Sequence, residues 1–104
     1  MESVRNLVNE KPLVIFSKSS CCVSHSMKQL MSSYGANATI YELDEIPNGN
    51  EVEKGLTSMG SKPSVPTIFI GNKFVGGSNE ILSLQIQGKL VPMLIEAGAI
   101  WVWK

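Results

Sequence analysis

The 104-residue sequence lacks the features that mark several large classes of protein. Basic and acidic residues number 9 each, so the formal net charge is zero and no positive excess directs the chain to nucleic acid or anionic lipid. No apolar run approaches the roughly 18 residues that a membrane-spanning helix requires. The sequence therefore predicts a globular domain with no direct nucleic-acid or membrane role.

Cysteine is also scarce. The only two, Cys21 and Cys22, are adjacent, and an adjacent pair does not form the disulfide framework of a small secreted protein. The first residues include Glu2 and Arg5 and carry neither a hydrophobic signal core nor an Arg/Ser-rich transit segment. We therefore expect a cytoplasmic protein that is small enough to enter the nucleus as well. Its cysteines are expected to take part in a reaction rather than in a structural disulfide.

The spacing of apolar residues predicts one domain over residues 1–104 in which helices and strands alternate. Helices are expected at 2–10, 22–34, 51–59, from 78 onward and at 90–97, and strands at 13–16, 39–43, 65–70 and 73–75. The early alternation implies a parallel strand pair, and the two-residue turn at 71–72 adds an antiparallel hairpin. The expected fold class is α/β, with a four-stranded mixed sheet flanked by helices.

Cys21 is the residue most expected to act as a nucleophile. The apolar run Leu13–Phe16 ends in small polar residues, and a helical pattern begins after the two cysteines. A strand, a turn and a helix in this order would place Cys21 at a helix N-terminus, where unpaired N–H groups and the macrodipole favour an anion. Lys18 adds a positive charge nearby in sequence. Both effects lower the pKa of a thiol, so Cys21 is the candidate nucleophile.

Three motifs in this order resemble the glutaredoxins. They are Lys18-Ser-Ser-Cys-Cys-Val-Ser24, Val65-Pro66 before a strand, and Gly76-Gly77-Ser78-Asn79 before a helix. The Cys-Cys-x-Ser pattern is similar to the plant CC-type (class III) group. The resemblance implies a thioredoxin-like fold and a glutathione-dependent thiol–disulfide oxidoreductase, in which Cys21 matches the catalytic cysteine.

The active-site motif favours a monothiol mechanism. Ser24 stands where glutaredoxins usually carry a resolving cysteine, and Cys22 stands where they carry proline. Adjacent Cα atoms lie about 3.8 Å apart, below the roughly 4.4 Å minimum of ordinary disulfides, so a Cys21–Cys22 bridge would be strained. We expect Cys21 to take the glutathionyl group from a glutathionylated substrate and a second glutathione to release it, with Cys22 and Ser24 as secondary active-site residues.

The resemblance also implies a glutathione-binding set. The Val65-Pro66 backbone would pair with the cysteinyl part of glutathione, and Gly77 would allow a close backbone approach. Ser78 and Asn79, at a helix N-terminus, would bind the γ-glutamyl carboxylate, and Lys18 would attract the glycine carboxylate. Helix capping by Ser78 and Asn79, and a solvated Lys18, remain the alternatives.

Two further functions follow from the resemblance. Two cysteines in one chain do not complete the four thiolates of a [2Fe-2S] cluster, but Cys21 from each chain of a homodimer and two glutathiones would. The apolar tail 98–104 contains Ala99-Ile100-Trp101-Val102, which resembles the Ala-Leu-Trp-Leu ending by which many CC-type members contact TGA-class bZIP transcription factors. This tail would make the protein a catalytically weak regulatory adaptor, unless it folds back on the core.

Overall fold

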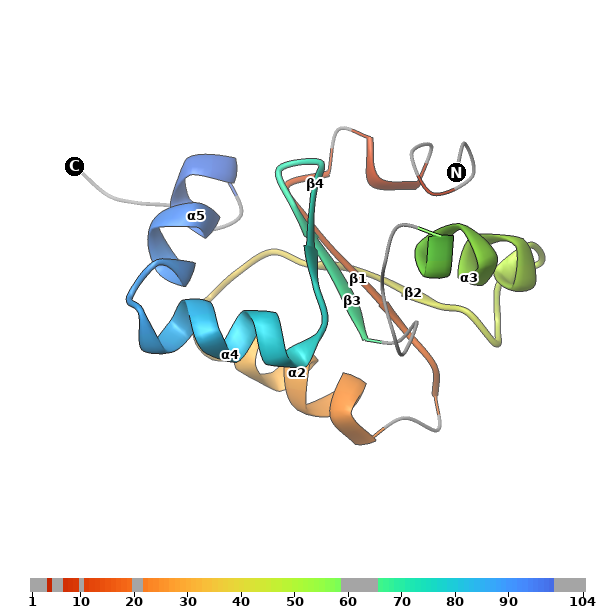
Figure 1. The fold of residues 1–104 in the computed structure, drawn as a ribbon, viewed down its shortest axis with the longest axis horizontal. Helices are drawn as coiled ribbons and strands as arrows, with labels where there is room; N and C mark the ends of the chain where they lie inside the picture. Colours follow the sequence, from red (N-terminus) through yellow and green to blue (C-terminus); the bar gives the residue numbers. More distant parts are fainter. Residues whose placement is uncertain (1–3, 5–6, 10, 20–21, 59–65, 99–104) are drawn as a thin grey trace.

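The expected elements are present in the computed structural model, which describes residues 4, 7–9, 11–19, 22–58 and 66–98 (Figure 1). In chain order they are β1 (Leu13–Ser17), α2 (Cys22–Ser33), β2 (Thr39–Glu42), α3 (Gly49–Ser58), β3 (Thr67–Ile70), β4 (Lys73–Gly76), α4 (Ser78–Ile86) and α5 (Leu90–Ala97). Residues 4, 7 and 8 are helical as well, within the expected first helix.

The four strands form one mixed sheet in the order β2-β1-β3-β4. β1 is parallel to β2, and β3 is antiparallel to both β1 and β4. The hairpin turn between β3 and β4 is formed by Gly71 and Asn72, whose φ angles are +60° and +69°. Two positive φ values match the twist of the flanking strands, as the sequence predicted.

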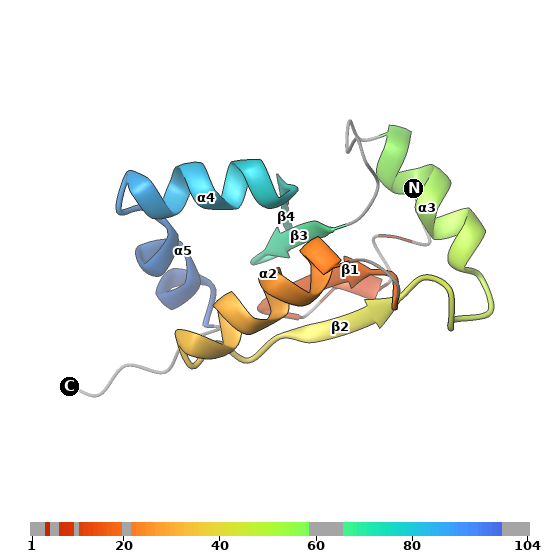
Figure 2. The same ribbon diagram turned by 90° about the horizontal axis from the view of Figure 1, so that it is seen from below.

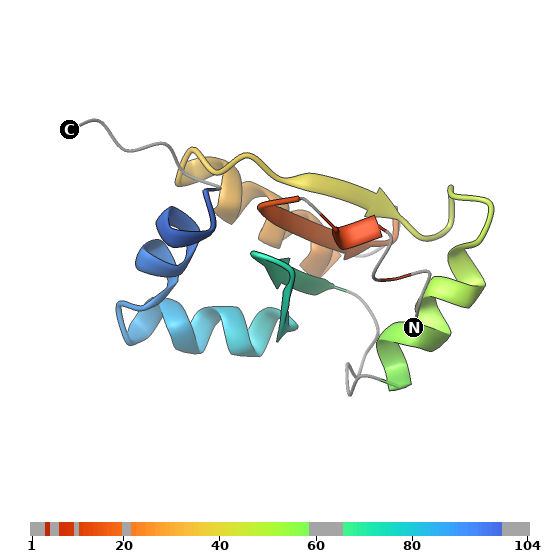
Figure 3. The same ribbon diagram turned by 90° about the horizontal axis from the view of Figure 1, so that it is seen from above.

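Each face of the sheet carries its own hydrophobic core, because successive side chains of a strand point to opposite faces. Leu13 and Ile15 of β1 pack with residues of α2, α4 and α5. Val14 and Phe16 pack instead with α3 and with the helical residues near the N-terminus. Figure 3 shows α4 and α5 on one side of the sheet and α3 on the other, while α2 lies against β1 (Figure 2).

Helix α2 buries one apolar stripe in the first of these cores. Met27 and Met31 are buried, and the partly buried Leu30 and Tyr34 pack beside them. The helix is followed by Gly35, whose φ of +72° lies in the left-handed region that favours glycine at a helix end. This packing fixes the direction of the helix that begins at Cys22.

One helix start and one helix cap differ from expectation. Helix α3 begins at Gly49 rather than Glu51, because the backbone carbonyl of Asn48 already accepts a hydrogen bond from the N–H of Val52 at 3.0 Å. Helix α4 is capped at Gly77, whose N–H donates to Glu80 Oε2 at 3.1 Å. Capping chemistry at this start was expected, but the cap position lies one residue before Ser78.

Two structural absences hold for the described part of the chain. No described helix is long and apolar enough to cross a membrane. The same residues contain no group of three or more His, Cys, Asp or Glu side chains that could hold a metal ion.

Candidate active site

The sheet topology brings several of the predicted site residues that the structure describes to one edge. The register pairs Ser17, at the end of β1, with Glu42, at the end of β2. It also pairs Phe16 with Thr67, at the start of β3, and β4 ends beside that start. Lys18, Pro66 and the start of α4 therefore lie at the same edge (Figure 1).

Buried hydroxyl groups are concentrated at this edge. Among the described residues, the buried polar side chains are Ser17, Ser24 and Thr67, all 0% exposed. They lie at the end of β1, in the first turn of α2 and at the start of β3. These hydroxyl groups lie inside the molecule beneath the edge at which the described site residues meet.

Cys22 and Ser24, both in the first turn of α2, face different environments. Cys22, the first residue of the helix, is exposed and carries a free thiol, whereas Ser24 is buried. A reagent in solution can therefore reach Cys22, while the Ser24 hydroxyl lies inside the molecule. Cys21 lies outside the described residues, so its role stays a prediction from its place in the sequence.

Lys18 forms an ion pair that the sequence did not predict. Its Nζ lies 2.9 Å from Oε2 of Glu53 on α3, and the two side chains are 36% and 30% exposed. Because 35 residues separate the partners, no local sequence signal identifies Glu53. The cation that was expected to attract a ligand carboxylate already has a carboxylate partner.

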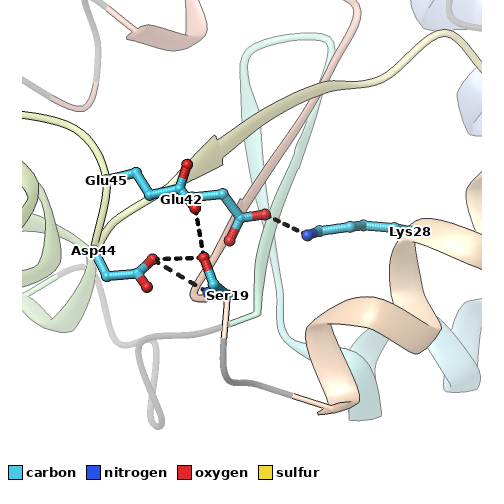
Figure 4. Close-up of polar contacts among 5 residues, drawn as sticks. All are labelled: Ser19, Lys28, Glu42, Asp44 and Glu45. Carbon is cyan, nitrogen blue, oxygen red and sulfur yellow. Dashed lines mark hydrogen bonds and ion pairs between the residues drawn. The ribbon is translucent and has the colours of Figure 1, made fainter.

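Ser19 is held by two acidic residues that follow β2 (Figure 4). Its backbone N–H donates to Asp44 Oδ1 at 3.2 Å, and its hydroxyl lies 2.6 Å from Glu45 Oε2 and 3.3 Å from Asp44 Oδ1. The backbone hydrogen bond from Ser19 is the main cause that lowers the pKa of the Asp44 carboxyl, and the nearby charge of Lys18 adds to it. Ser19 is thereby tied to the residues that follow β2.

A second ion pair ties α2 to β2. Lys28 Nζ contacts Glu42 Oε1, and both side chains are less than a quarter exposed (Figure 4). The other Glu42 oxygen is buried without a hydrogen-bond partner among the described residues. Removal of Lys28 would leave a mostly buried carboxylate uncompensated, so the pair fixes α2 relative to the sheet.

Pro66 and the start of α4 lie in contact. A Cβ atom on Gly77 would stand 3.2 Å from the Pro66 carbonyl oxygen, which leaves little room for a side chain. Ser78 is half-buried and Asn79 is exposed, both in the first turn of α4. The structure thus brings Pro66 and Gly77 together, and Ser78 and Asn79 follow Gly77 in the first turn of α4. Val65 lies outside the described residues.

Glycine is also required at the end of β4. Gly76 is buried and has a φ of +125°, and a Cβ there would lie 2.9 Å from Cγ and Cδ of Glu80. The Glu80 side chain is the one that accepts the hydrogen bond of Gly77 N–H. Asn79 and Glu80 line an open cavity of about 420 Å³ beside this turn.

Fold and site together define a thioredoxin-like protein with a cysteine motif at the start of a helix. The crystal structure of a buckwheat glutaredoxin–glutathione complex is similar, with a TM-score of 0.91 and 38% sequence identity over 96% of this chain and 91% of that one. The chain belongs to the glutaredoxin family, whose sequence pattern matches residues 13–75.

Plant relatives match over nearly the full length. Monothiol glutaredoxin-S6 of Arabidopsis thaliana is 60% identical over 102 residues, which cover 98% of this chain and 100% of the relative. Monothiol glutaredoxin-S1 of the same plant is 56% identical over the same shares. The predicted tail motif at 99–102 lies outside the described residues.

Proposed function

We propose that the protein is a glutathione-dependent thiol–disulfide oxidoreductase that works through Cys21 alone. The observation that carries the proposal is the contrast in the first turn of α2: the buried position three residues after Cys21 is Ser24, and the remaining thiol, Cys22, is exposed. A serine hydroxyl forms no disulfide. The similarity to a glutaredoxin that binds glutathione supports the choice of substrate.

The proposed reaction has two thiol–disulfide exchanges. In the first, the Cys21 thiolate attacks the glutathione sulfur of a glutathionylated substrate. The substrate–glutathione S–S bond breaks, the substrate sulfur leaves with the electron pair and takes a proton from water, and Cys21 becomes glutathionylated. In the second, the thiolate of a free glutathione attacks the same sulfur. Oxidised glutathione leaves, and the Cys21 thiolate returns.

The proposed binding roles use residues on both sides of the site. The first-turn N–H groups of α4, with Ser78 and Asn79, would bind the γ-glutamyl carboxylate at a helix N-terminus. Pro66 adjoins Gly77 and, with Val65, would present backbone to the cysteinyl part. Lys18 would attract the glycine carboxylate from the opposite side of the site. Glutathione would therefore lie between the segment after β1 and the start of α4.

The test is glutathione-coupled reduction of a glutathionylated peptide by the wild type, Cys21→Ser and Cys22→Ser. The two variants make the same chemical change at adjacent positions, so each controls for the other. The proposal predicts that Cys21→Ser abolishes turnover and that Cys22→Ser retains most of it. Loss of turnover in both variants would favour a mechanism through the strained Cys21–Cys22 disulfide. An inactive wild type would refute the proposed enzymatic activity.

The two alternative functions have separate tests. A [2Fe-2S] carrier would require Cys21 from two chains and two glutathiones, because no described group of side chains in one chain could hold the metal. A brown product of anaerobic purification, lost in Cys21→Ser, would support it. An adaptor in the cytoplasm and nucleus would bind TGA-class bZIP factors through residues 99–102, and removal of residues 99–104 would abolish that binding.

A further inference from the structure

We propose that Glu53 is a specificity-determining residue that weakens the binding of glutathione through its ion pair with Lys18. The inference rests on the proposed function, in which Lys18 receives the glycine carboxylate. Glu53 belongs to α3, outside every motif that the sequence analysis identified. Its Oε2 lies 2.9 Å from Lys18 Nζ, within ordinary hydrogen-bond distance.

The ion pair makes the ligand carboxylate compete with a protein carboxylate. An incoming glycine carboxylate either displaces Glu53 from Lys18 or shares the ammonium with it, and sharing brings two like charges together. Either arrangement reduces the binding free energy that the glycine carboxylate gains from Lys18. The two side chains are about one-third exposed, so water and salt reduce the competition without removing it.

The neighbouring charges strengthen this effect. Asp44 and Glu45 bind Ser19, the residue after Lys18, and the lowered pKa of Asp44 keeps its carboxylate ionised at neutral pH. Three carboxylates therefore approach residues 18 and 19, against the single cation of Lys18. Glutathione carries two carboxylates and one ammonium, so these three protein carboxylates oppose the attraction of Lys18 for its glycine carboxylate.

A consequence for substrate choice follows. A disulfide partner that brings a cation to this side would meet Glu53, Asp44 and Glu45 favourably, whereas an anionic one would not. Glu53 also lines an open cavity of about 510 Å³ on α3, together with Asn50, Lys54, Thr57 and Ser58. The inferred preference is for glutathionylated proteins with basic residues near the modified cysteine.

The experiment compares Glu53→Gln with Glu51→Gln, a matched change of charge at an exposed position on the same helix. Glu53→Gln is expected to lower the KM for a glutathionylated peptide about threefold with kcat unchanged, while Glu51→Gln changes neither. The difference should shrink in 0.5 M salt. An equal KM in the two variants, with an active wild type, would overturn the inference and leave the proposed function intact.

Equilibrium binding separates the inference from catalysis. Each substitution is placed in a Cys21→Ser background and titrated with S-methylglutathione, which has no free thiol. Tighter binding by Glu53→Gln than by Glu51→Gln supports the inference even if the wild type has no turnover. In the Glu53→Gln background, Lys18→Gln should weaken binding more than it does with Glu53 present, and an equal effect in both backgrounds would overturn the inference.

Discussion

The two sides of the candidate site are held in place by different interactions. On the charged side, residues 18 and 19 are bound by carboxylates of Glu53, Asp44 and Glu45 from other elements. On the glycine side, Gly76 and Gly77 fit closely against Glu80 and Pro66, without an ion pair among the described residues. One side depends on charge and the other on the absence of side chains.

Because of this difference, substitutions should have different effects on the two sides. A single charge change on the charged side alters the electrostatic potential of the site and leaves the backbone path intact. A single methyl group on the glycine side meets occupied space. Affinity for charged ligands should therefore be tuned on the first side, and the shape of the site should be preserved on the second.

The largest expected effect concerns the helix that carries Glu53. Gly49, the first residue of α3, is buried, and a Cβ there would lie 1.8 Å from the carbonyl oxygen of Leu43. Since this neighbour is backbone, Gly49→Ala should move α3 and destabilise the protein by about 3 kcal/mol. Urea unfolding measures the loss. Gly88→Ala, at a φ of +73° with open space around it, is the control and should cost about 1 kcal/mol.

An intermediate effect is expected on the glycine side. Gly76→Ala combines a φ of +125° with a contact of 2.9 Å to the Glu80 side chain and should cost about 2 kcal/mol in urea unfolding. Removal of the Glu80 side chain relieves the contact but not the backbone strain. Gly76→Ala should therefore cost less in a Glu80→Ala background, and an equal cost in both would show that the contact is unimportant.

The smallest effect is a pH dependence on the charged side. Hydrogen bonds from Ser19 lower the pKa of Asp44 below its ordinary value of 3.8. The stabilisation is therefore complete above that value and is lost as the pH falls through the lowered pKa. Urea unfolding should find Asp44→Asn less stable than the wild type at pH 6, with a smaller difference at pH 3. A difference that stays constant would contradict the assignment.

The sequence predicted what depends on local patterns. The apolar run at 13–16 marked β1, glycine and asparagine at 71–72 marked the hairpin turn, and the bounds of α5 agree with the structure. Interactions between distant segments left no such signal. Neither the spacing around Lys18 nor that around Glu53 reveals a contact across 35 residues, because only the packing of α3 beside the sheet creates it.

The same limit applies to the candidate site. The motif residues Pro66, Gly77, Ser78 and Asn79 lie together because the register of β1, β3 and β4 aligns their ends. The sequence placed the start of α4 correctly but not its cap at Gly77, since the Glu80 side chain reaches back to that residue. Burial of Ser24 beside exposed Cys22 also depends on how α2 packs.

The most direct test of the central claim is to locate the glutathionyl group on the protein. The reduced protein is mixed with a glutathionylated peptide, quenched by acid and digested, and the modified cysteine is identified by tandem mass spectrometry. The proposed mechanism predicts one glutathionyl group on Cys21 in the wild type and in Cys22→Ser, and none in Cys21→Ser. A glutathionyl group found on Cys22, with Cys21 unmodified, would contradict it.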